Sequence, residues 1–508
     1  MHKGRLYRTI RSIIALLAFL WITALLLDIH HRIPDSWFYP LRYLQLVPAL
    51  QASLGLAGGA IIALATLLLL SWFFGRIYCS TLCPLGVMQD LAGRIRGWLK
   101  KKSRYRKQQT NAGWRYGFLF LFLLSVFIGS GLFTGLLDPY SHFSRIIRNL
   151  IQPPFVFANN QLAWWLTSIG SYALSPVKFH GISWASAGFS AGVFGMIIWM
   201  VWRNGRVFCN TLCPVGTLLG LPGKRALLGI RMDHTACTSC GLCAVVCKAG
   251  CIDVKKKEID NSRCVLCFNC IPACDLGGIR YGKAVPVETD FSRRDTLLRA
   301  GTTLILPAVL KEVSEEDKAL AIRRASLSPP GSLSHANLHI QCTACHLCIS
   351  TCPTGVLQPA FAEYGLSGVF QPLMDPISGY CNYDCIRCLE VCPTGAILPM
   401  TVEDKQRVQV GRARFIPELC VVTKDHTACG ACSEHCPTKA VDMLPWKDGL
   451  TIPVVDTEIC VGCGACEYAC PTDPRSIVVD GNPIHQRAAL PLIDKEEAEE
   501  ASIEEFPF

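Results

Sequence analysis

Cysteines are the residues of this chain whose spacing most clearly indicates chemistry. The 508-residue sequence has 29 cysteines, most of them in short runs in which neighbouring cysteines are separated by two or three residues. Residues 237–247 and 264–274 both follow the pattern C-x2-C-x2-C-x3-C. This spacing is typical of chains that hold paired 4Fe-4S clusters, in which three thiolates of a run bind one cluster and the fourth binds the partner cluster. The two runs therefore predict two clusters and one-electron transfer.

The crossed arrangement predicts how these eight cysteines divide between the two clusters. One cluster takes Cys237, Cys240, Cys243 and Cys274, and the other takes Cys264, Cys267, Cys270 and Cys247. The proline that usually follows the fourth cysteine is absent, because Lys248 and Asp275 stand at those positions. Cys251 is left over and could replace Cys247 as a ligand.

Four further cysteine quartets follow, and in each the last cysteine precedes a proline. They are Cys342, Cys345, Cys348 and Cys352; Cys381, Cys385, Cys388 and Cys392; Cys420, Cys429, Cys432 and Cys436; and Cys460, Cys463, Cys466 and Cys470. Structural zinc sites usually separate two cysteine pairs by a dozen or more residues, so zinc fits these compact runs poorly. A disulfide framework suits small secreted chains better than a chain of this length. The quartets predict four more 4Fe-4S clusters, with the pairing of quartets, nested or adjacent, left open.

Two shorter cysteine pairs lie in residues 78–86 (YCSTLCPLG) and 208–216 (FCNTLCPVG), each just after a long apolar segment. Residues 75–91 and 205–221 are identical at nine of seventeen positions, which indicates an internal repeat of two helices and one C-x3-CP loop. A two-fold repeat would bring four cysteines together as ligands of a possible seventh cluster. These cysteines are Cys79, Cys83, Cys209 and Cys213. Packing at helix ends and thiol redox chemistry are the alternatives.

The composition indicates that much of the chain lies in a membrane. Its mean hydropathy is +0.32, and 51% of its residues are hydrophobic while 17% are charged. Four apolar segments, 12–28, 52–74, 115–137 and 186–202, are long enough to cross a bilayer, which takes about 20 residues. Basic residues precede the first segment and separate the second from the third, which predicts that both ends of this unit face the cytoplasm. A cleaved signal peptide is the alternative for the first segment.

The predicted fold class is an α-helical transmembrane bundle of four spans, with a possible fifth apolar segment, joined to small α+β ferredoxin-like domains that bind 4Fe-4S clusters. The predicted domains are a membrane domain of two repeated two-helix units (1–205), a C-x3-CP loop and cytoplasmic two-cluster ferredoxin (206–290), a twin-arginine-like signal or anchor with a linker (291–335), a four-cluster ferredoxin (336–485) and an acidic tail (486–508). The net charge of +10 follows from the basic cytoplasmic segments and does not indicate a nucleic-acid partner.

The stretch between the two cysteine-rich parts, 291–310, resembles a twin-arginine export signal. It has Ser292, Arg293, Arg294 and Leu297 in the expected order, and an apolar run of eleven residues follows. Such a signal would carry the folded, cluster-bearing second half across the membrane. An ordinary basic and apolar helix, which would leave the second half in the cytoplasm, is the alternative.

Polar residues that follow two apolar segments are candidates for a quinol site. His30 and His31 follow the first segment, and Asp138 and His142 follow the third. Oxidation of a quinol requires groups that accept protons, and histidine does so near neutral pH. Capping of helix ends and plain solvation are the alternatives for these residues. The C-x3-CP loops are expected on the opposite, cytoplasmic side, a bilayer thickness of about 30 Å away.

These motifs carry a family resemblance. Residues 1–290, with four apolar segments, two C-x3-CP loops and a two-cluster run, resemble the NapH-like membrane ferredoxins of the periplasmic nitrate reductase system. Residues 291–480, with four quartets, are similar to the NapG/MauM ferredoxins, which the family places in the periplasm. The resemblance implies a fusion of two proteins that act as a quinol-oxidising pair in the bacterial inner membrane.

The function that we expect is electron transfer from quinol, through 4Fe-4S clusters, to a periplasmic reductase or cytochrome in anaerobic respiration. The chain would be an electron-transfer component of such a complex and not a complete enzyme, because it has no Walker loop or dinucleotide-binding motif. The alternative is a cytoplasmic-facing ferredoxin for metal reduction or oxidase maturation, similar to the CcoG type. That alternative leaves the extension with four quartets without a role.

Overall fold

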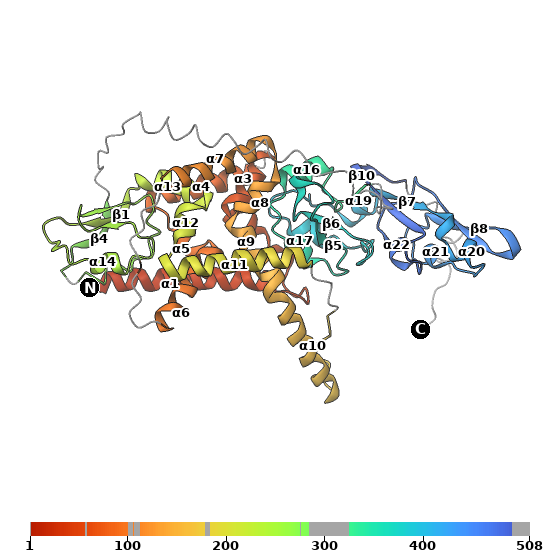
Figure 1. Cartoon of the computed structure of the whole chain (residues 1–508), viewed down its shortest axis with the longest axis horizontal. Helices are drawn as coiled ribbons and strands as arrows, with labels where there is room; N and C mark the ends of the chain where they lie inside the picture. Colours follow the sequence, from red (N-terminus) through yellow and green to blue (C-terminus); the bar gives the residue numbers. More distant parts are fainter. Residues whose placement is uncertain are drawn as a thin grey trace, which may run out of the picture.

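The computed structural model describes residues 2–55, 58–99, 105, 112–177, 183–274, 276–283 and 325–489. The twin-arginine-like stretch 291–310, Asp275 and nearly all of the acidic tail lie outside the described residues. Within the described residues, the chain forms a bundle of helices with a cysteine-rich module at each end (Figure 1).

Among the described residues, two helices are long and apolar enough to cross a bilayer. They are α1 (His2–Leu26), through its part Gly4–Leu26, and α11 (Trp184–Asn204). Helices α4 (Gly58–Phe74) and α7 (Ala112–Ile128) are also apolar but have 17 residues each, close to the lower limit for a membrane span. All four apolar segments of the sequence thus form helices, and two of these helices have the length of a candidate span.

The second and third apolar segments are each divided between two helices. Helix α3 (Leu46–Leu54) precedes α4, and α8 (Gly131–Leu137) follows α7. Gly129, at the second of these breaks, has a φ of 71°, which glycine adopts without steric strain. The helices are therefore shorter than the apolar segments that contain them.

Both C-x3-CP stretches fold in the same way. Each forms a short helix, α5 (Tyr78–Thr81) or α12 (Val207–Thr211). A longer helix then begins at the proline, α6 (Pro84–Leu99) or α13 (Pro214–Lys224). Proline suits the first turn of a helix because that turn leaves its backbone nitrogen without an intrahelical partner. The matching folds agree with the internal repeat in the sequence.

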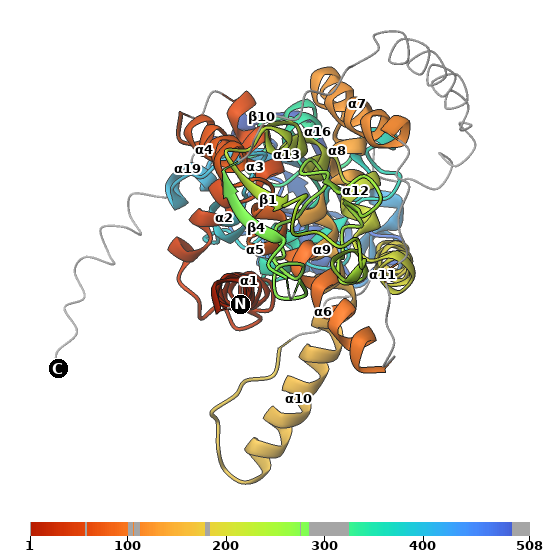
Figure 2. The ribbon, with the colours of Figure 1, turned by 90° about the vertical axis from the view of Figure 1, so that its left-hand side faces the viewer.

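Five further helices belong to this part of the described chain. They are η1 (Asp35–Trp37), α2 (Tyr39–Leu44), α9 (Pro139–Ile146), η2 (Ile147–Ile151) and α10 (Gln152–Ser168). Helix α10 projects away from the bundle (Figure 2) and exposes Phe157, Trp164 and Trp165. Tryptophan is enriched where membranes meet water, so this exposed helix suits the surface of a bilayer.

The first cysteine-rich module is a small α+β unit of short strands and loops. Strand β1 (Leu228–Met232) pairs antiparallel with β4 (Ile279–Lys283), and β2 (Ile252–Asp253) pairs antiparallel with β3 (Glu258–Ile259). Helix α14 (Leu242–Val245) lies between β1 and β2 in the chain. Loops between these short elements carry most of the cysteines of the module.

The second module occupies residues 325–489 and contains three two-stranded antiparallel sheets, β5 with β6, β7 with β10, and β8 with β9. Its strands are β5 (Leu357–Pro359), β6 (Pro372–Met374), β7 (Val408–Phe415), β8 (Val441–Pro445), β9 (Thr451–Val455) and β10 (Ile477–Arg487). Its helices are α16 (His335–Gln341), α17 (Leu347–Thr351), η5 (Leu366–Gly368), α18 (Arg387–Val391), α19 (Val402–Gln406), η6 (Pro417–Leu419), α20 (Val421–Lys424), α21 (Ala431–Glu434), η7 (Lys447–Gly449) and α22 (Ala465–Ala469).

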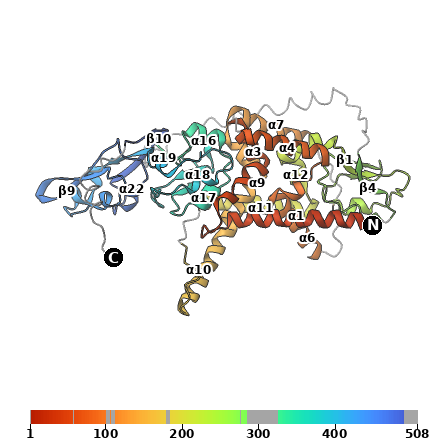
Figure 3. The same ribbon diagram turned by 180° about the vertical axis from the view of Figure 1, so that it is seen from behind.

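The two modules pack on opposite ends of the bundle (Figures 1 and 3). At one end, the centroid of the Tyr7 ring of α1 lies 5.7 Å from that of the Phe268 ring in the first module. At the other end, the Phe189 ring of α11 lies 4.9 Å from the Phe370 ring of the second module. Arg42 of α2 also donates to a backbone carbonyl of the second module. The bundle therefore separates the two groups of predicted cluster ligands.

Close backbone contact at this second end gives a testable prediction for Gly131. A Cβ added at Gly131 would lie 2.6 Å from the His339 carbonyl oxygen and 3.1 Å from the Cys342 carbonyl oxygen. We expect Gly131→Ala to destabilise the docked module by about 1–3 kcal/mol, as overpacking does. Hydrogen–deuterium exchange of the backbone of α16 should become faster.

The matched control is Gly117→Ala on α7, where an added Cβ meets no atom within 4 Å. Exchange in α16 should stay unchanged in this variant, because alanine in an open helical position favours the helix. Equal exchange rates in both variants would contradict the tight contact at Gly131.

Candidate functional site

The first module brings its cysteines together in the crossed sets that the spacing predicts. Burial, together with the sulfurs of Cys240, Cys237 and Cys274, raises the pKa of Cys243. Cys274 therefore lies beside the first run although it belongs to the second in the sequence. The exchange of fourth cysteines between the two runs agrees with the crossed assignment.

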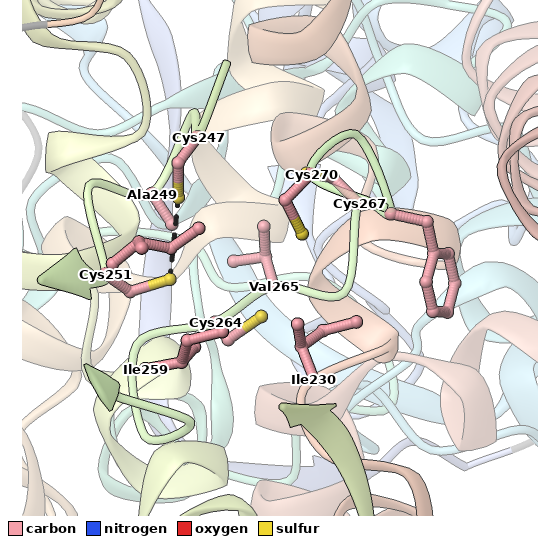
Figure 4. A pocket seen from close by; sticks show the side chains of 11 residues that line it. Ile230, Cys247, Ala249, Cys251, Ile259, Cys264, Val265, Cys267 and Cys270 are labelled. Atoms are coloured by element: carbon pink, nitrogen blue, oxygen red, sulfur yellow. Dashed lines mark hydrogen bonds between the residues drawn. The ribbon is translucent and has the colours of Figure 1, made fainter. Parts of the chain in front are cut away.

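The second set of this module faces one cavity (Figure 4). Its cysteine lining comprises Cys247, Cys251, Cys264, Cys267 and Cys270. Apolar side chains complete the wall, and four of the five cysteines are the predicted ligands of one cluster. Thiolates that converge from two runs on one apolar cavity form a donor set that suits a 4Fe-4S cluster.

In the second module, the first two quartets exchange their fourth cysteines. Burial and the sulfurs of Cys345, Cys342 and Cys392 raise the pKa of Cys348, so the last cysteine of the second quartet lies with the first quartet. The reverse exchange is equally clear, because one cavity is lined by Cys352 together with Cys381, Cys385 and Cys388. The sequence left the pairing of quartets open, and the structure pairs these two as neighbours.

The third and fourth quartets exchange their last cysteines in the same way. Burial and the sulfurs of Cys463, Cys460 and Cys436 raise the pKa of Cys466. Burial, with Cys429 and Cys470 nearby, raises the pKa of Cys432 to about 11. Cys420, the remaining cysteine of the third quartet, is buried. Among the described residues, no three Cys, His, Asp or Glu side chains converge closely enough for a single metal ion.

Each fourth cysteine of the second module lies beside a threonine hydroxyl two residues further along the chain. The sulfur-to-oxygen distances are 3.6 Å for Cys352 and Thr354, 3.7 Å for Cys392 and Thr394, 3.6 Å for Cys436 and Thr438, and 3.1 Å for Cys470 and Thr472. Hydrogen bonds to ligand sulfurs tune the reduction potential of a cluster. These threonines were not among the residues predicted from the sequence, although Cys-Pro-Thr recurs in all four quartets.

The two C-x3-CP loops meet inside the bundle. Burial and the sulfurs of Cys209, Cys83 and Cys79 raise the pKa of Cys213, so the four predicted cysteines form one group. All four are buried. The structure therefore brings together the four sulfurs that a two-fold repeat was expected to join.

Two fully buried arginines fasten the loops to each other. Arg76, which precedes the first loop, donates through Nη2 to the carbonyl oxygen of Cys209 at 3.1 Å. Arg206, which precedes the second loop, donates through Nη1 to the carbonyl oxygen of Cys79 at 2.6 Å. Each arginine thus binds the backbone of the opposite loop, as a two-fold repeat requires. These charges also lie close to the sulfurs, where they favour thiolate ligands.

Asp90 on α6 is a buried carboxylate that the sequence analysis missed. It pairs with Arg11 Nη1 at 2.9 Å, Arg206 Nη2 at 2.9 Å and Lys248 Nζ at 3.2 Å. Burial alone would raise the pKa of Asp90, but the three cations outweigh it and hold that pKa below its usual range. The sequence contained one signal for Asp90. The second repeat has Gly220 at the equivalent position, so the carboxylate is a departure from the repeated pattern.

Helix α9 connects the C-x3-CP loops with the second module. Its His142 ring lies 6.2 Å from the ring of Phe208, the residue before Cys209. One turn later, the Arg145 guanidinium lies 5.6 Å from the centroid of the Phe370 ring in the second module. The expected separation of a bilayer thickness between these loops and the predicted quinol residues therefore does not hold for His142, which lies beside the second loop.

The predicted quinol residues divide into two groups, one of which lines a cavity. His30 and His31 face a cavity of about 310 Å³, which Cys352 and Pro353 of the second module also line. His30 Nε2 lies 2.9 Å from Asn159 Oδ1, so its ring is held in place by α10. This cavity joins the membrane half to the module that carries the predicted clusters.

Asp138 and His142, the other predicted quinol residues, do not line that cavity. Asp138 caps α9, because its carboxylate accepts from the backbone nitrogens of Tyr140 at 3.1 Å and Ser141 at 3.0 Å. The His142 ring is buried and stacks on Phe189. The local reason is that α9 begins at Pro139, so its polar residues turn into the bundle.

Comparison with known domain families identifies the cofactor. A profile described as a 4Fe-4S binding domain matches residues 56–106 and 186–231, which contain the two C-x3-CP loops. A profile described as a 4Fe-4S dicluster domain matches residues 427–473, which contain most of the third and fourth quartets. The chain therefore has 4Fe-4S domains in both halves.

Several curated proteins are similar to part of this chain. The ferredoxin-type protein NapH of Haemophilus influenzae is 27% identical over 232 residues, which are 44% of this chain and 66% of NapH. The methylamine utilization ferredoxin-type protein MauN of Methylorubrum extorquens is 28% identical over 203 residues, 39% of this chain and 55% of MauN. The putative electron transport protein YccM of Escherichia coli is 24% identical over 217 residues, 43% of this chain and 54% of YccM. No solved structure matches.

The fold and the sites define a class of protein, a membrane-associated iron-sulfur electron carrier with several clusters. Within that class the chain is similar to the NapH-like polyferredoxins, since part of it is similar to NapH and MauN and both of its halves contain 4Fe-4S domains. The matches span about half to two thirds of the length of these relatives.

The buried charge cluster around Asp90 gives a second prediction. Asp90→Asn would leave Arg11, Arg206 and Lys248 without their shared carboxylate, which should cost about 3–5 kcal/mol of folding free energy. Because the folded pKa is depressed, the stabilisation is fully present above the unfolded pKa of about 4 and is lost as the pH falls towards the folded pKa. The melting temperature of the detergent-purified protein tests both statements. It is measured between about pH 3 and about pH 7, because this range includes the unfolded pKa of carboxylates, which is about 4.

The control is Asp480→Asn, because Asp480 pairs with Arg414 at 2.9 Å in a partly exposed position. This ion pair should contribute at most about 1 kcal/mol. If the two variants lose the same stability at neutral pH, the special role of Asp90 is wrong.

Proposed function

We propose that this polyferredoxin oxidises quinol and passes the electrons through its 4Fe-4S clusters to a periplasmic reductase or cytochrome. Thiolate-held 4Fe-4S clusters supply one-electron carriers. The relatives NapH and MauN, whose names mark them as ferredoxin-type proteins, support electron transport. The second half would correspond to the NapG/MauM ferredoxins.

The observation that carries this proposal is the cavity between His30 and Cys352. Its volume of about 310 Å³ falls in the range of about 300–1,000 Å³ that is usual for small-molecule sites. One wall comes from the membrane half and the other from Cys352 and Pro353, at the edge of a predicted cluster. A quinol here would lie beside the first electron acceptor, with no further protein layer between them.

The polar groups of this cavity suit a hydroxyl group, which both donates and accepts hydrogen bonds. The Oε1 atom of Gln152 and the Nε atom of Arg148 are buried and have no hydrogen-bond partner among the described residues. Both residues line the cavity with His30 and His31. Because His30 Nε2 donates to Asn159, Nδ1 of the neutral ring is the nitrogen that can accept a proton. A quinol releases two electrons and two protons; the amide of Gln152 and the guanidinium of Arg148 can hydrogen-bond its hydroxyl groups, while the imidazoles of His30 and His31 can accept the protons.

The arrangement of the modules supports a periplasmic second half. The basic residues at the start of α1 lie at the end of the bundle that carries the first module, and such residues stay in the cytoplasm. The second module packs on the opposite end. With α1, α4, α7 and α11 as four spans, the first module would be cytoplasmic and the second periplasmic.

The experiment that tests the quinol site is the rate at which menadiol reduces the anaerobic, cluster-loaded protein. His30→Ala should lower this rate about 100-fold or more, because a general base typically contributes that much. Stopped-flow bleaching of the cluster absorbance measures the rate, and iron analysis confirms that the variant is fully loaded. His234→Ala, an exposed histidine of the first module, is the control and should keep the wild-type rate. A wild-type rate in His30→Ala would refute the site.

The location of the second module is tested with a C-terminal epitope tag in cells. In intact spheroplasts, externally added protease should remove the tag, because a periplasmic second module is accessible from outside even when it is exported in the folded state. A tag that is removed only after the spheroplasts are permeabilised would place the second module in the cytoplasm and favour the CcoG-like alternative.

A further inference from the structure

Cys251 is the one cysteine that the spacing leaves outside every ligand set. The structure buries its side chain, with 4% of the residue exposed, in the wall of the cavity that holds the predicted ligands Cys247, Cys264, Cys267 and Cys270. Its sulfur lies 3.6 Å from that of Cys247 (Figure 4). This separation is too long for a disulfide bond of about 2.05 Å. Five cysteines therefore face a cavity whose cofactor takes four.

The surroundings of Cys247 differ from those of the other fourth cysteines. In the second module, that position has a proline after it and a threonine hydroxyl beside its sulfur, as described above. At Cys247 the next two residues are Lys248 and Ala249. Ala249 offers no hydroxyl, and Lys248 pairs with Asp90. The thiol of Cys251 takes the place of the threonine hydroxyl at a similar distance, but unlike a hydroxyl it is also a good iron ligand.

The backbone holds Cys251 in this position from both sides. The turn that precedes it is closed by a hydrogen bond from Gly250 N to the Cys247 carbonyl at 3.2 Å, and Gly250 has a φ of 58°. Arg263 Nη2 donates to the Gly250 carbonyl at 2.7 Å. The carbonyl of Cys251 accepts from Asp260 N at 2.9 Å. Cys251 is thus fixed by the turn and directed into the cavity, whereas a surplus cysteine on a loop could point anywhere.

We propose that Cys251 is a reserve ligand, which takes the fourth position beside Cys264, Cys267 and Cys270 whenever Cys247 does not occupy it. The exchange forms one iron–sulfur bond and breaks another. The proton of the Cys251 thiol is released, and Cys247 takes up a proton as it leaves the iron. No electron is gained or lost, so the exchange changes the ligand without changing the oxidation state.

Iron and acid-labile sulfide per chain, measured on the full-length protein, test this proposal. Cys247→Ala should keep the wild-type content, because Cys251 replaces the missing ligand. The double variant Cys247→Ala/Cys251→Ala should lose one cluster, which contains four irons and four sulfides. Cys251→Ala should keep its iron, because Cys247 remains. The unchanged electron paramagnetic resonance signals of the other clusters report that each variant is folded.

Cys274→Ala is the matched control, because Cys274 is the fourth cysteine of the partner set and Leu276 and Gly278 stand two and four residues after it. This variant should lose its cluster. If Cys247→Ala loses iron as Cys274→Ala does, or shows the signal of a three-iron cluster, Cys251 is not a reserve ligand. Retention of all iron by the double variant would equally overturn the proposal. None of these readings depends on quinol or on an electron acceptor.

Discussion

The carboxylate of Asp90 binds three cations that come from distant parts of the chain. Arg11 belongs to α1, Arg206 precedes the second C-x3-CP loop, and Lys248 follows Cys247 in the first module. Because a buried charge without a partner is costly, these parts cannot separate without exposing or stranding a charge. The relative position of the first membrane helix, the buried loops and the first module therefore depends on one side chain.

Reciprocal contacts then fix the interior of the bundle. Arg76 and Arg206 each bind the carbonyl of the opposite C-x3-CP loop, so neither loop reaches its position alone. Helix α9 extends this order to the other end, where Arg145 lies over Phe370. A change in the packing of the loops would thus shift α9 and alter its contacts with the second module. Assembly of the bundle and docking of the second module are therefore coupled.

Much of the site could be predicted from the sequence, because cysteine spacing is a local property. The crossed sets of the first module needed only the two runs between 237 and 274. The pairing of the four later quartets depends on tertiary packing, so no spacing revealed it. Asp90 could not be predicted because its three partners are far away in the chain. Nothing in the sequence indicated that a helix beginning at Pro139 would turn His142 into the bundle. Local motifs could be predicted from the sequence, while contacts between residues far apart in the chain could not.

The adjacent pairing of quartets has a consequence for how such a chain can evolve. Each pair of neighbouring quartets in the second module is a contiguous stretch that completes its own two ligand sets. The backbone hydrogen bond from Cys381 N to the Cys463 carbonyl, 2.9 Å long, joins the two stretches. Duplication of one stretch would add two complete sites in series without disturbing an existing one. The module is therefore built like a tandem repeat, whose length is set by the number of units, as in other repeat proteins.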